Sequence, residues 1–153
     1  MRLSVILFSI LLPVSAALAD QQVLRDADGR RIGTIEPSGP NGGRRTVRDA
    51  SGTRIQTIEP ESSGSDRLIV RDRTGRRVET IDPVHSGSER RVVRDASGQL
   101  LRTIEPEYRG ADRHIVRDAA GRRLQTIEPE FKGSGTLVIR DADGRRIGTI
   151  DHR

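Results

Sequence analysis

The chain has 153 residues, no cysteine, and 27 Lys and Arg against 22 Asp and Glu, which gives a formal net charge of +5 at pH 7. Without cysteine, strand pairing and packing must hold the protein together, since no disulfide can form. With one tyrosine and two phenylalanines, the chain also lacks the aromatic platforms on which proteins stack sugars or single-stranded nucleic-acid bases.

Residues 1–19 are predicted to be a secretory signal peptide. Arg2 gives a positive start, an apolar run follows as far as Leu12, and Ala17-Leu18-Ala19 has the pattern of a signal peptidase site. The apolar run is shorter than the roughly 20 residues of a membrane-spanning helix. We therefore expect cleavage between Ala19 and Asp20, a periplasmic or secreted location, and no transmembrane segment after signal removal.

The remainder, 20–153, is predicted to be one domain made of a repeat. The motif Arg-Asp-Ala-x-Gly-Arg-Arg-x-x-Thr-Ile-Glu-Pro recurs six times at intervals of 23 residues, without insertion or deletion. A fixed period of this length indicates supersecondary units that shelter one another. The repeats cover about 21–43, 44–66, 67–89, 90–112, 113–135 and 136–153.

Each repeat contains two short runs typical of β-strands, as the third repeat illustrates. Its first run ends with Ile69 and Val70 just before Arg-Asp. Its second run contains Val78 and, three positions later, Ile81 preceded by Thr. Branched aliphatic residues and threonine favour strands. The Ile of the second run is present in all copies, at 35, 58, 81, 104, 127 and 150.

An Asp-x-x-Gly turn joins the two runs in every repeat. The Asp side chain opens a type I turn by bonding the following backbone, and the Gly takes the left-handed conformation that closes the turn as a bulge. The structural turn residues are Gly29, Gly52, Gly75, Gly98, Gly121 and Gly144.

This turn places the arginine before each Asp opposite a second basic position across the hairpin. Like charges directly opposed are destabilising, so we expect acids of the neighbouring repeat, such as Glu36, Glu59 and Glu105, to separate them. Val70 and Val78 would then lie on the other face. Ile69 and Ile81 would share the arginine face unless a bulge shifts the register. Because both faces carry apolar residues, the pattern favours hairpins stacked between neighbours over a sheet with one wet side.

The segments between repeats are predicted to be ordered loops. Each follows a proline (37, 60, 83, 106 or 129) with about seven residues rich in Gly, Ser and charge. Gly64, Gly87, Gly110 and Gly133 recur at one loop position, where the first repeat has Asn41. Gly and Asn adopt positive φ most readily, which indicates one left-handed residue in each loop.

The predicted fold class is all-β: six tandem hairpin repeats with about twelve short antiparallel strands. Two arrangements fit, a closed propeller- or flower-like ring and an open hairpin stack. The copies at 25–35 and 140–150 are identical, whereas the terminal units of open arrays are atypical, so the identity favours closure. The small aliphatic content makes self-association a further expectation.

The repeat unit resembles the hairpin of bacterial exported proteins called five-fold β-flowers, which read Arg-Asp-x-x-Gly-Arg-x-x-Gly-x-Ile. Residues 25–35 and 140–150 match best, with Gly33 and Gly148 in place. The other copies carry Gln56, Glu79, Arg102 and Gln125 at that Gly. Each match covers about twelve residues of a repeat. The resemblance implies a small exported protein and no catalytic residues.

Residues suited to chemistry are few, and we predict no catalytic residue, no metal site and no cofactor. The three histidines, His85, His114 and His152, do not sit in an arrangement typical of acid–base catalysis. Asp26-x-Asp28-Gly29 resembles the start of a calcium loop, but the required later Glu is missing, so a turn is the better interpretation.

The arginines are the candidate functional residues, because closely spaced arginine binds phosphates and acidic glycans. The competing interpretation is a lattice of ion pairs with Asp and Glu. Candidate anion-binding residues are Arg25, Arg48, Arg71, Arg94, Arg117, Arg140, Arg31, Arg54, Arg77, Arg123 and Arg146.

Two hypotheses for function follow. The leading one is an exported structural or protein-interaction protein without catalytic activity. The alternative is an anion-binding module that uses the repeated arginine face to bind lipopolysaccharide, an acidic glycan or nucleic acid. The expected partner is therefore an unknown protein or an anionic envelope polymer, and no small-molecule substrate is evident.

Overall fold

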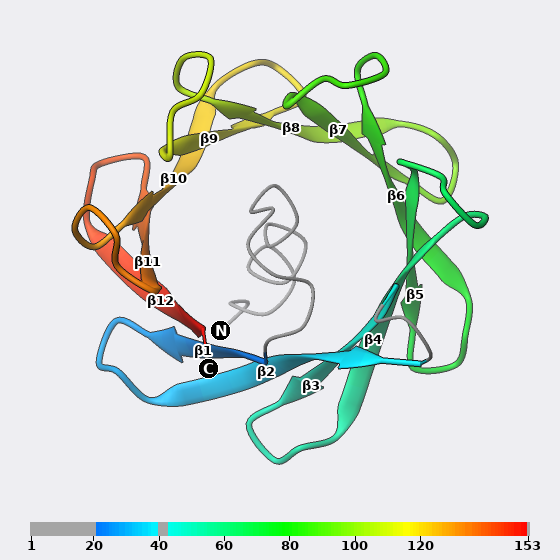
Figure 1. The fold of residues 1–153 in the computed structure, drawn as a ribbon, viewed down its shortest axis with the longest axis horizontal. Coiled ribbons are helices and arrows are strands. Elements are labelled where there is room, and N and C mark those ends of the chain that lie inside the picture. The colour runs from blue at the N-terminus through cyan, green and yellow to red at the C-terminus, as the bar shows by residue number, and fades with distance from the viewer. Residues whose placement is uncertain (1–20, 40–42, 153) are drawn as a thin grey trace.

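The aliphatic runs of the repeats form the strands of one closed barrel (Figure 1). The computed structural model describes residues 21–39 and 43–152, and in that part of the chain every regular element is a β-strand. The predicted all-β class is therefore confirmed. The strands are β1 Gln22–Asp26, β2 Arg31–Ser38, β3 Arg44–Asp49, β4 Arg54–Pro60, β5 Leu68–Asp72, β6 Arg77–Pro83, β7 Arg91–Asp95, β8 Leu100–Pro106, β9 His114–Asp118, β10 Arg123–Pro129, β11 Thr136–Asp141 and β12 Arg146–His152.

Closure is complete, because each strand pairs antiparallel with its neighbours in sequence and β1 pairs with β12. Of the two predicted arrangements, the closed ring is confirmed and the open stack is wrong. Strands of different repeats pair as continuously as strands of one repeat: β4 and β5 pair from Gln56↔Asp72 to Pro60↔Leu68. The ring is one continuous sheet, so every strand pairs with a neighbour on both sides and no strand edge is left unpaired.

The six Asp-x-x-Gly turns lie at one end of the barrel, called here the turn end. In the second repeat, Asp49 Oδ1 accepts the N–H groups of Ser51 and Thr53, both at 2.9 Å. The N–H of Gly52 donates to the carbonyl of Asp49 at 3.1 Å, and Gly52 has φ of 87°. The predicted turn is confirmed. All six of its glycines have positive φ.

The turn imposes a bulge that decides which residues face inward. In the third hairpin Arg71 pairs with Arg77 and Val70 pairs with Glu79, so Val78 is the extra residue. The predicted opposition of arginines is therefore confirmed. Because of the bulge, Ile81 lies opposite Val93 on the same face as Val70, and Ile69 lies opposite Thr80 on the arginine face.

The inter-repeat loops lie at the other end, called here the loop end, together with the start of β1 and the end of β12. Glu61 N–H donates to the carbonyl of Arg67, and Ser65 N–H donates to that of Ser62, both at 3.0 Å. Gly64, Gly87, Gly110 and Gly133 have φ between 75° and 82°, as predicted. The corresponding prediction for Asn41 lies outside the described residues.

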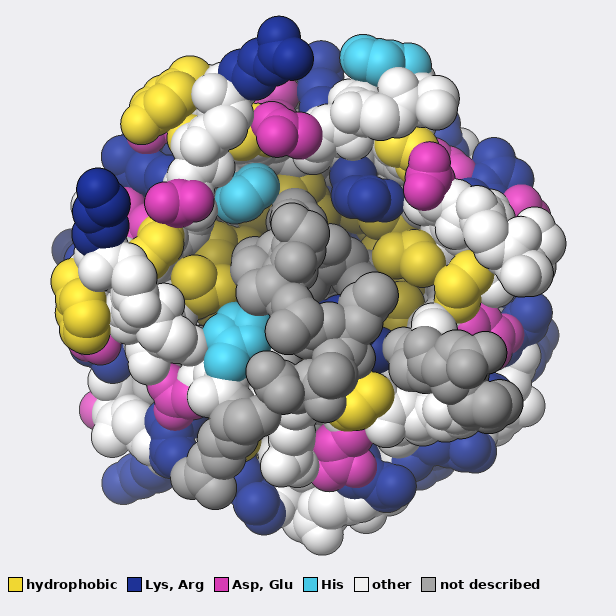
Figure 2. Space-filling view, viewed as in Figure 1, with side chains coloured by type: hydrophobic (Ala, Val, Ile, Leu, Met, Phe, Trp, Pro, Cys, Tyr) yellow, Lys and Arg dark blue, Asp and Glu magenta, His cyan; other side chains and the backbone are white. Residues whose placement is uncertain are grey.

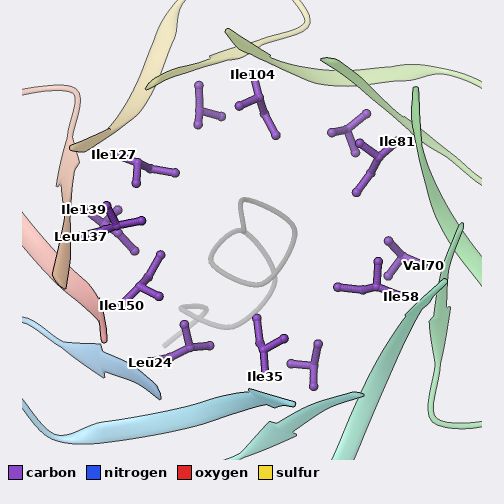
Figure 3. Packing of buried hydrophobic residues seen from close by; sticks show 13 residues of the cluster. Leu24, Ile35, Ile58, Val70, Ile81, Ile104, Ile127, Leu137, Ile139 and Ile150 are labelled. Atoms are coloured by element: carbon purple, nitrogen blue, oxygen red, sulfur yellow. The ribbon is translucent and has the colours of Figure 1, made fainter. Parts of the chain in front are cut away.

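The core lies inside the ring, with side chains from every strand directed at the barrel axis (Figure 3). The strand alternation puts the Ile of each second run and the residue two before each Asp on this inner face. The outer face carries the arginines. The prediction that both faces carry apolar residues is confirmed, because Ile69 and Val138 of the outer face are 7% and 3% exposed. Closure nevertheless places the main core on the inner face. The inward aliphatic residues, here the aliphatic belt, are Leu24, Ile35, Val47, Ile58, Val70, Ile81, Val93, Ile104, Val116, Ile127, Ile139 and Ile150.

Candidate functional site

The predicted arginines lie on the outer face, where most of those before the Asp form ion pairs with the preceding repeat. Arg48 Nε donates to Glu36 Oε2 at 3.2 Å, and Arg71 Nε donates to Glu59 Oε1 at 2.7 Å. Each of these arginines also donates to the carbonyl of its own turn glycine. The expected role of the neighbouring acids is thus confirmed. The equivalent pairs are Arg117–Glu105, Arg140–Glu128 and, across the seam, Arg25–Asp151.

Arg94 is the exception in this set. The acid of its preceding repeat is Asp82, which pairs with Arg67 of the loop end. Arg94 donates to the carbonyl of Gly98 at 3.2 Å. Its cation is therefore the one in this row of arginines that no described carboxylate neutralises.

The second set of arginines reaches sideways to the next repeat. Arg31, Arg54 and Arg123 donate to the carbonyls of Ala50, Arg73 and Ala142 at 3.0–3.2 Å. These bonds tie adjacent turns together and leave the guanidinium charge without a carboxylate. Arg146 differs, because its guanidinium lies 3.6 Å from Glu130.

Arg77 lines a shallow, open pocket between the third and fourth turns. Arg76 and Val78 also contribute, and the next turn adds Asp95 to Ser97. The Arg77 side chain has no hydrogen bond or ion pair with a described residue. The structure therefore brings the predicted arginines together as a lattice of contacts, in which the residues without a described carboxylate partner are Arg31, Arg54, Arg77, Arg94 and Arg123.

The inner face carries two rings of mixed chemistry, one on each side of the aliphatic belt. The ring nearer the turns, here the turn-end ring, follows from pairs such as Val47↔Gln56 and Val93↔Arg102, since directly paired residues share a face. It consists of Gly33, Gln56, Glu79, Arg102, Gln125 and Gly148. The loop-end ring follows from pairs such as Arg45↔Ile58 and consists of Gln22, Arg45, Leu68, Arg91, His114 and Leu137.

An ion pair is buried in the turn-end ring. Arg102 donates from one terminal nitrogen to both carboxylate oxygens of Glu79 at 2.9 Å, and each residue is only 6% exposed. Three other polar atoms of this ring are buried without a hydrogen-bond partner: Gln56 Oε1, Gln125 Oε1 and Arg102 Nε. An unsatisfied buried polar group costs free energy, so these atoms lower the stability of the barrel unless water or another group pairs with them.

The loop-end ring is basic. Arg45 is 8% exposed and makes no ion pair with a described residue, and burial lowers the pKa of its guanidinium. Arg91 donates to the carbonyl of Asp66 at 3.2 Å. Gln22 Oε1 and His114 Nδ1 are buried without a partner. Burial lowers the pKa of His114, although the carbonyl and charge of Asp112 and the charge of Glu89 act in the opposite direction.

Neither ring was predicted from the sequence, although the turn-end ring has a recognisable sequence signal. The turn-end ring occupies the position at which the β-flower pattern has Gly. There the six repeats have Gly, Gln, Glu, Arg, Gln and Gly, in a motif that is otherwise regular. A position that varies chemically within a regular repeat is not fixed by the fold. Its inward direction depends on the bulge, so it was not assigned to an interior.

The loop end also exposes three large apolar residues. Tyr108 is 69% exposed, Phe131 is 66% exposed and Val84 is 47% exposed. They lie in three consecutive loops of the ring, after β6, β8 and β10. Figure 2 shows hydrophobic side chains standing out at the rim of this end, and others recessed within the ring.

All three histidines lie at the loop end, and the first calcium-like turn has the hydrogen bonds of an ordinary turn. His85 lies in the loop after β6, and His152 contacts Gln22 at 3.5 Å across the seam. Asp26 Oδ1 accepts the N–H groups of Asp28 and Arg30, which is the geometry of a turn. Within the described ranges no group of three or more His, Cys, Asp or Glu residues could hold a metal ion.

Comparison with known proteins supports the fold. No family model matches the chain, and no curated protein matches it. The chain is similar to the X-ray structure of a protein from Arabidopsis thaliana, with a TM-score of 0.56 and 14% identity over 84% of this chain and 78% of that one. At this identity the likeness extends to the fold alone. No helix in residues 21–39 and 43–152 is long and apolar enough to cross a membrane.

Proposed function

We propose that this protein is an exported, non-catalytic interaction protein whose loop end binds a partner protein. The observation that carries the proposal is the exposure of Tyr108 and Phe131 at equivalent positions of neighbouring loops. Aromatic residues are enriched in the central contacts of protein interfaces. In a chain with almost no other aromatic residues, their location on two adjacent loop tips supports a contact surface.

The loops present these side chains on a defined backbone. In each loop the aromatic residue is followed by a cation and then by a glycine with positive φ, as in Tyr108-Arg109-Gly110. The N–H of Ala111 donates to the carbonyl of Tyr108 at 2.9 Å, and that of Ser134 to Phe131 at the same distance. An ordered loop lowers the entropy lost on binding.

Export is part of the same proposal and is supported by the sequence. The apolar run and Ala17-Leu18-Ala19 have the pattern of a signal peptide. The resemblance of the repeat to five-fold β-flowers, itself a proposal at the level of the family, agrees with an exported protein. A periplasmic or secreted location is tested by fractionation and by the N-terminal sequence of the exported form, for which Asp20 is expected.

The interaction is tested by capture from envelope extracts. The exported protein, immobilised through a tag, should retain a defined partner. The double substitution Tyr108→Ser and Phe131→Ser should reduce capture at least ten-fold with an unchanged circular dichroism spectrum. Ser62→Ala, at the equivalent tip of another loop, is the matched control and should leave capture unchanged. Equal capture by the double variant and the parent would disprove the assignment.

The second candidate is anion binding by the outer arginines, and Arg77 and Arg94 favour it because no described carboxylate neutralises them. Heparin or lipopolysaccharide affinity should then fall steeply between about 50 and 200 mM salt. Arg77→Gln with Arg94→Gln should weaken retention more than Arg48→Gln with Arg71→Gln, whose guanidinium groups already pair with acids. No retention at 50 mM salt would exclude this candidate.

A further inference from the structure

The barrel is built from more strands than one whose interior is just filled by its own side chains. An eight-stranded barrel is just filled by its inward side chains, whereas barrels of more strands enclose additional space. This barrel has twelve strands, and each contributes an aliphatic residue to the belt. Figure 3 shows these side chains projecting from the wall toward a common axis. The wall is therefore suited to surrounding an apolar body.

Some polar atoms within this interior have no hydrogen-bond partner in the part of the chain that the structure describes. Gln22 is 3% exposed and Gln125 is 8% exposed, and the side-chain oxygen of each is buried without a hydrogen bond. Arg102 is 6% exposed and its Nε has no acceptor. Since buried polar atoms are nearly always paired, the interior of the exported protein must also admit water, which can donate to the glutamine oxygens and accept from Arg102 Nε.

The sign of the charge at the loop end selects the polar part of the ligand. The inward strand positions there carry the guanidinium groups of Arg45 and Arg91 and no carboxylate, and the charges of Glu89 and Asp112 in the adjoining loops act on His114. Arg45 has no ion pair with a described residue, and Arg91 donates only to a backbone carbonyl. Two buried or half-buried cations that face the same space bind an anion in preference to a neutral group.

We propose that the barrel interior binds a single-chain anionic amphiphile of the fatty-acid class. Its carboxylate would accept hydrogen bonds from Arg45 and Arg91 in the loop-end ring, and its alkyl chain would lie along the aliphatic belt. A wholly apolar ligand would leave the arginines unpaired. A compact anion such as phosphate would leave the belt without contacts. This site shares no residue with the exposed loop tips.

Binding is measured on the exported protein after removal of copurified lipid, by calorimetry with saturated fatty acids from eight to sixteen carbons. Affinity should rise by about three- to four-fold for each methylene that enters the belt. The primary alcohol of the same length should bind at least ten-fold more weakly than the acid. Phosphate alone should not bind.

Arg91→Gln is the discriminating variant, and Arg90→Gln is its matched control. The two arginines are adjacent in the chain: Arg91 begins β7 on the inner face, whereas Arg90 precedes the strand and pairs with Glu105 at 3.3 Å. Arg91→Gln, alone and with Arg45→Gln, should lower fatty-acid affinity about ten-fold or more and remove the preference for acid over alcohol. Arg90→Gln should change neither quantity. Circular dichroism and thermal melting establish that each variant is folded.

Three results would overturn the proposal. One is the absence of binding at every chain length, and another is an affinity that does not depend on chain length. The third is equal binding of acid and alcohol by the parent protein, which would remove the role of the arginines. Should Arg91→Gln fail to fold, the chain-length series and the acid-to-alcohol ratio of the parent protein still test the proposal.

The two proposals are tested separately by the loop-tip variant Tyr108→Ser with Phe131→Ser. Loss of partner capture by this variant, with fatty-acid binding intact, would show that the two sites are independent.

Discussion

Neighbouring residues of the same strands form the inner and outer faces of this barrel, but the two faces contribute to stability in different ways. On β7, Val93 is fully buried in the aliphatic belt, while Arg94 lies at the surface beside its turn. The inner face gains free energy by removing apolar area from water. The outer face separates like charges with acids and carbonyls, which contributes little stability because these groups remain partly hydrated. The aliphatic belt therefore contributes most of the stability of the ring, and the outer contacts mainly relieve the repulsion between arginines.

The largest effect should come from the buried ion pair of the inner face. Glu79→Gln leaves Arg102 buried beside an uncharged group and should lower the free energy of unfolding by about 3–5 kcal/mol. Adding Arg102→Gln should recover most of the loss, because glutamine already occupies this ring at 56 and 125. Denaturant titration of both variants measures the difference. A double variant less stable than the single one would contradict the interpretation.

The next effect compares adjacent valines that face opposite sides. Val93→Ala removes fully buried methyl groups and should cost about 2–3 kcal/mol. Val92→Ala, one residue earlier on the half-buried outer face, should cost under about 1 kcal/mol. Chemical denaturation of the two variants provides the test. Equal losses would show that the faces do not differ in their contribution.

The turns that carry the chain from one strand to the next should be sensitive at the glycine. Gly52 has φ of 87°, a conformation that costs an L-residue about 1–3 kcal/mol. Gly52→Ala should therefore destabilise the barrel by that amount. Gly135→Ala is the control, since Gly135 lacks positive φ and a Cβ there would meet nothing within 4 Å. A similar loss at both glycines would argue against backbone strain as the cause.

A smaller effect is expected from an ion pair of the outer face. Arg71→Gln removes the 2.7 Å contact with Glu59, whose side chain remains partly exposed, so the loss should be at most about 1 kcal/mol. It should shrink as salt is raised. Arg94→Gln should show no such salt dependence, because Arg94 has no described acid partner. Thermal melts at low and high salt distinguish these outcomes.

The smallest effect concerns acid and the turn aspartates. A hydrogen bond from the Ser51 hydroxyl holds the pKa of Asp49 below its usual 3.8, although desolvation raises it. A depressed folded pKa gives stability that is present above the unfolded pKa and is lost as pH falls below about 4. Ser51→Ala should raise the pKa of Asp49 and make this acid loss shallower. Carboxyl chemical shifts across a pH series measure both quantities.

Much of the fold could be predicted from the sequence because its determinants are local. The Asp side chain and the left-handed Gly determine the Asp-x-x-Gly turn. This turn then places Arg71 opposite Arg77. A bulge that shifts the register was considered from the sequence, but its presence at Val78 was not predicted. That single residue decides the face of Ile81, and one residue of register moves a whole strand to the other face.

The candidate sites were less accessible to sequence reasoning. The arginines drew attention because they recur, and the structure places them in a lattice of contacts. Gln125 and Arg102 became candidates only when the closed sheet turned their position inward. The aromatic residues of the loop tips were visible in the sequence. Their adjacency depended on the order of the strands around the ring.

The sequence by itself determined the strands, the turns and the equal length of the repeats, because each depends on interactions within a few residues. Only the tertiary structure decided that β1 and β12 join, that the ring has an inside, and which side chains line it. Closure joins residues more than a hundred positions apart in the chain. It follows from the summed twist and stagger of all the strands, which no single repeat contains.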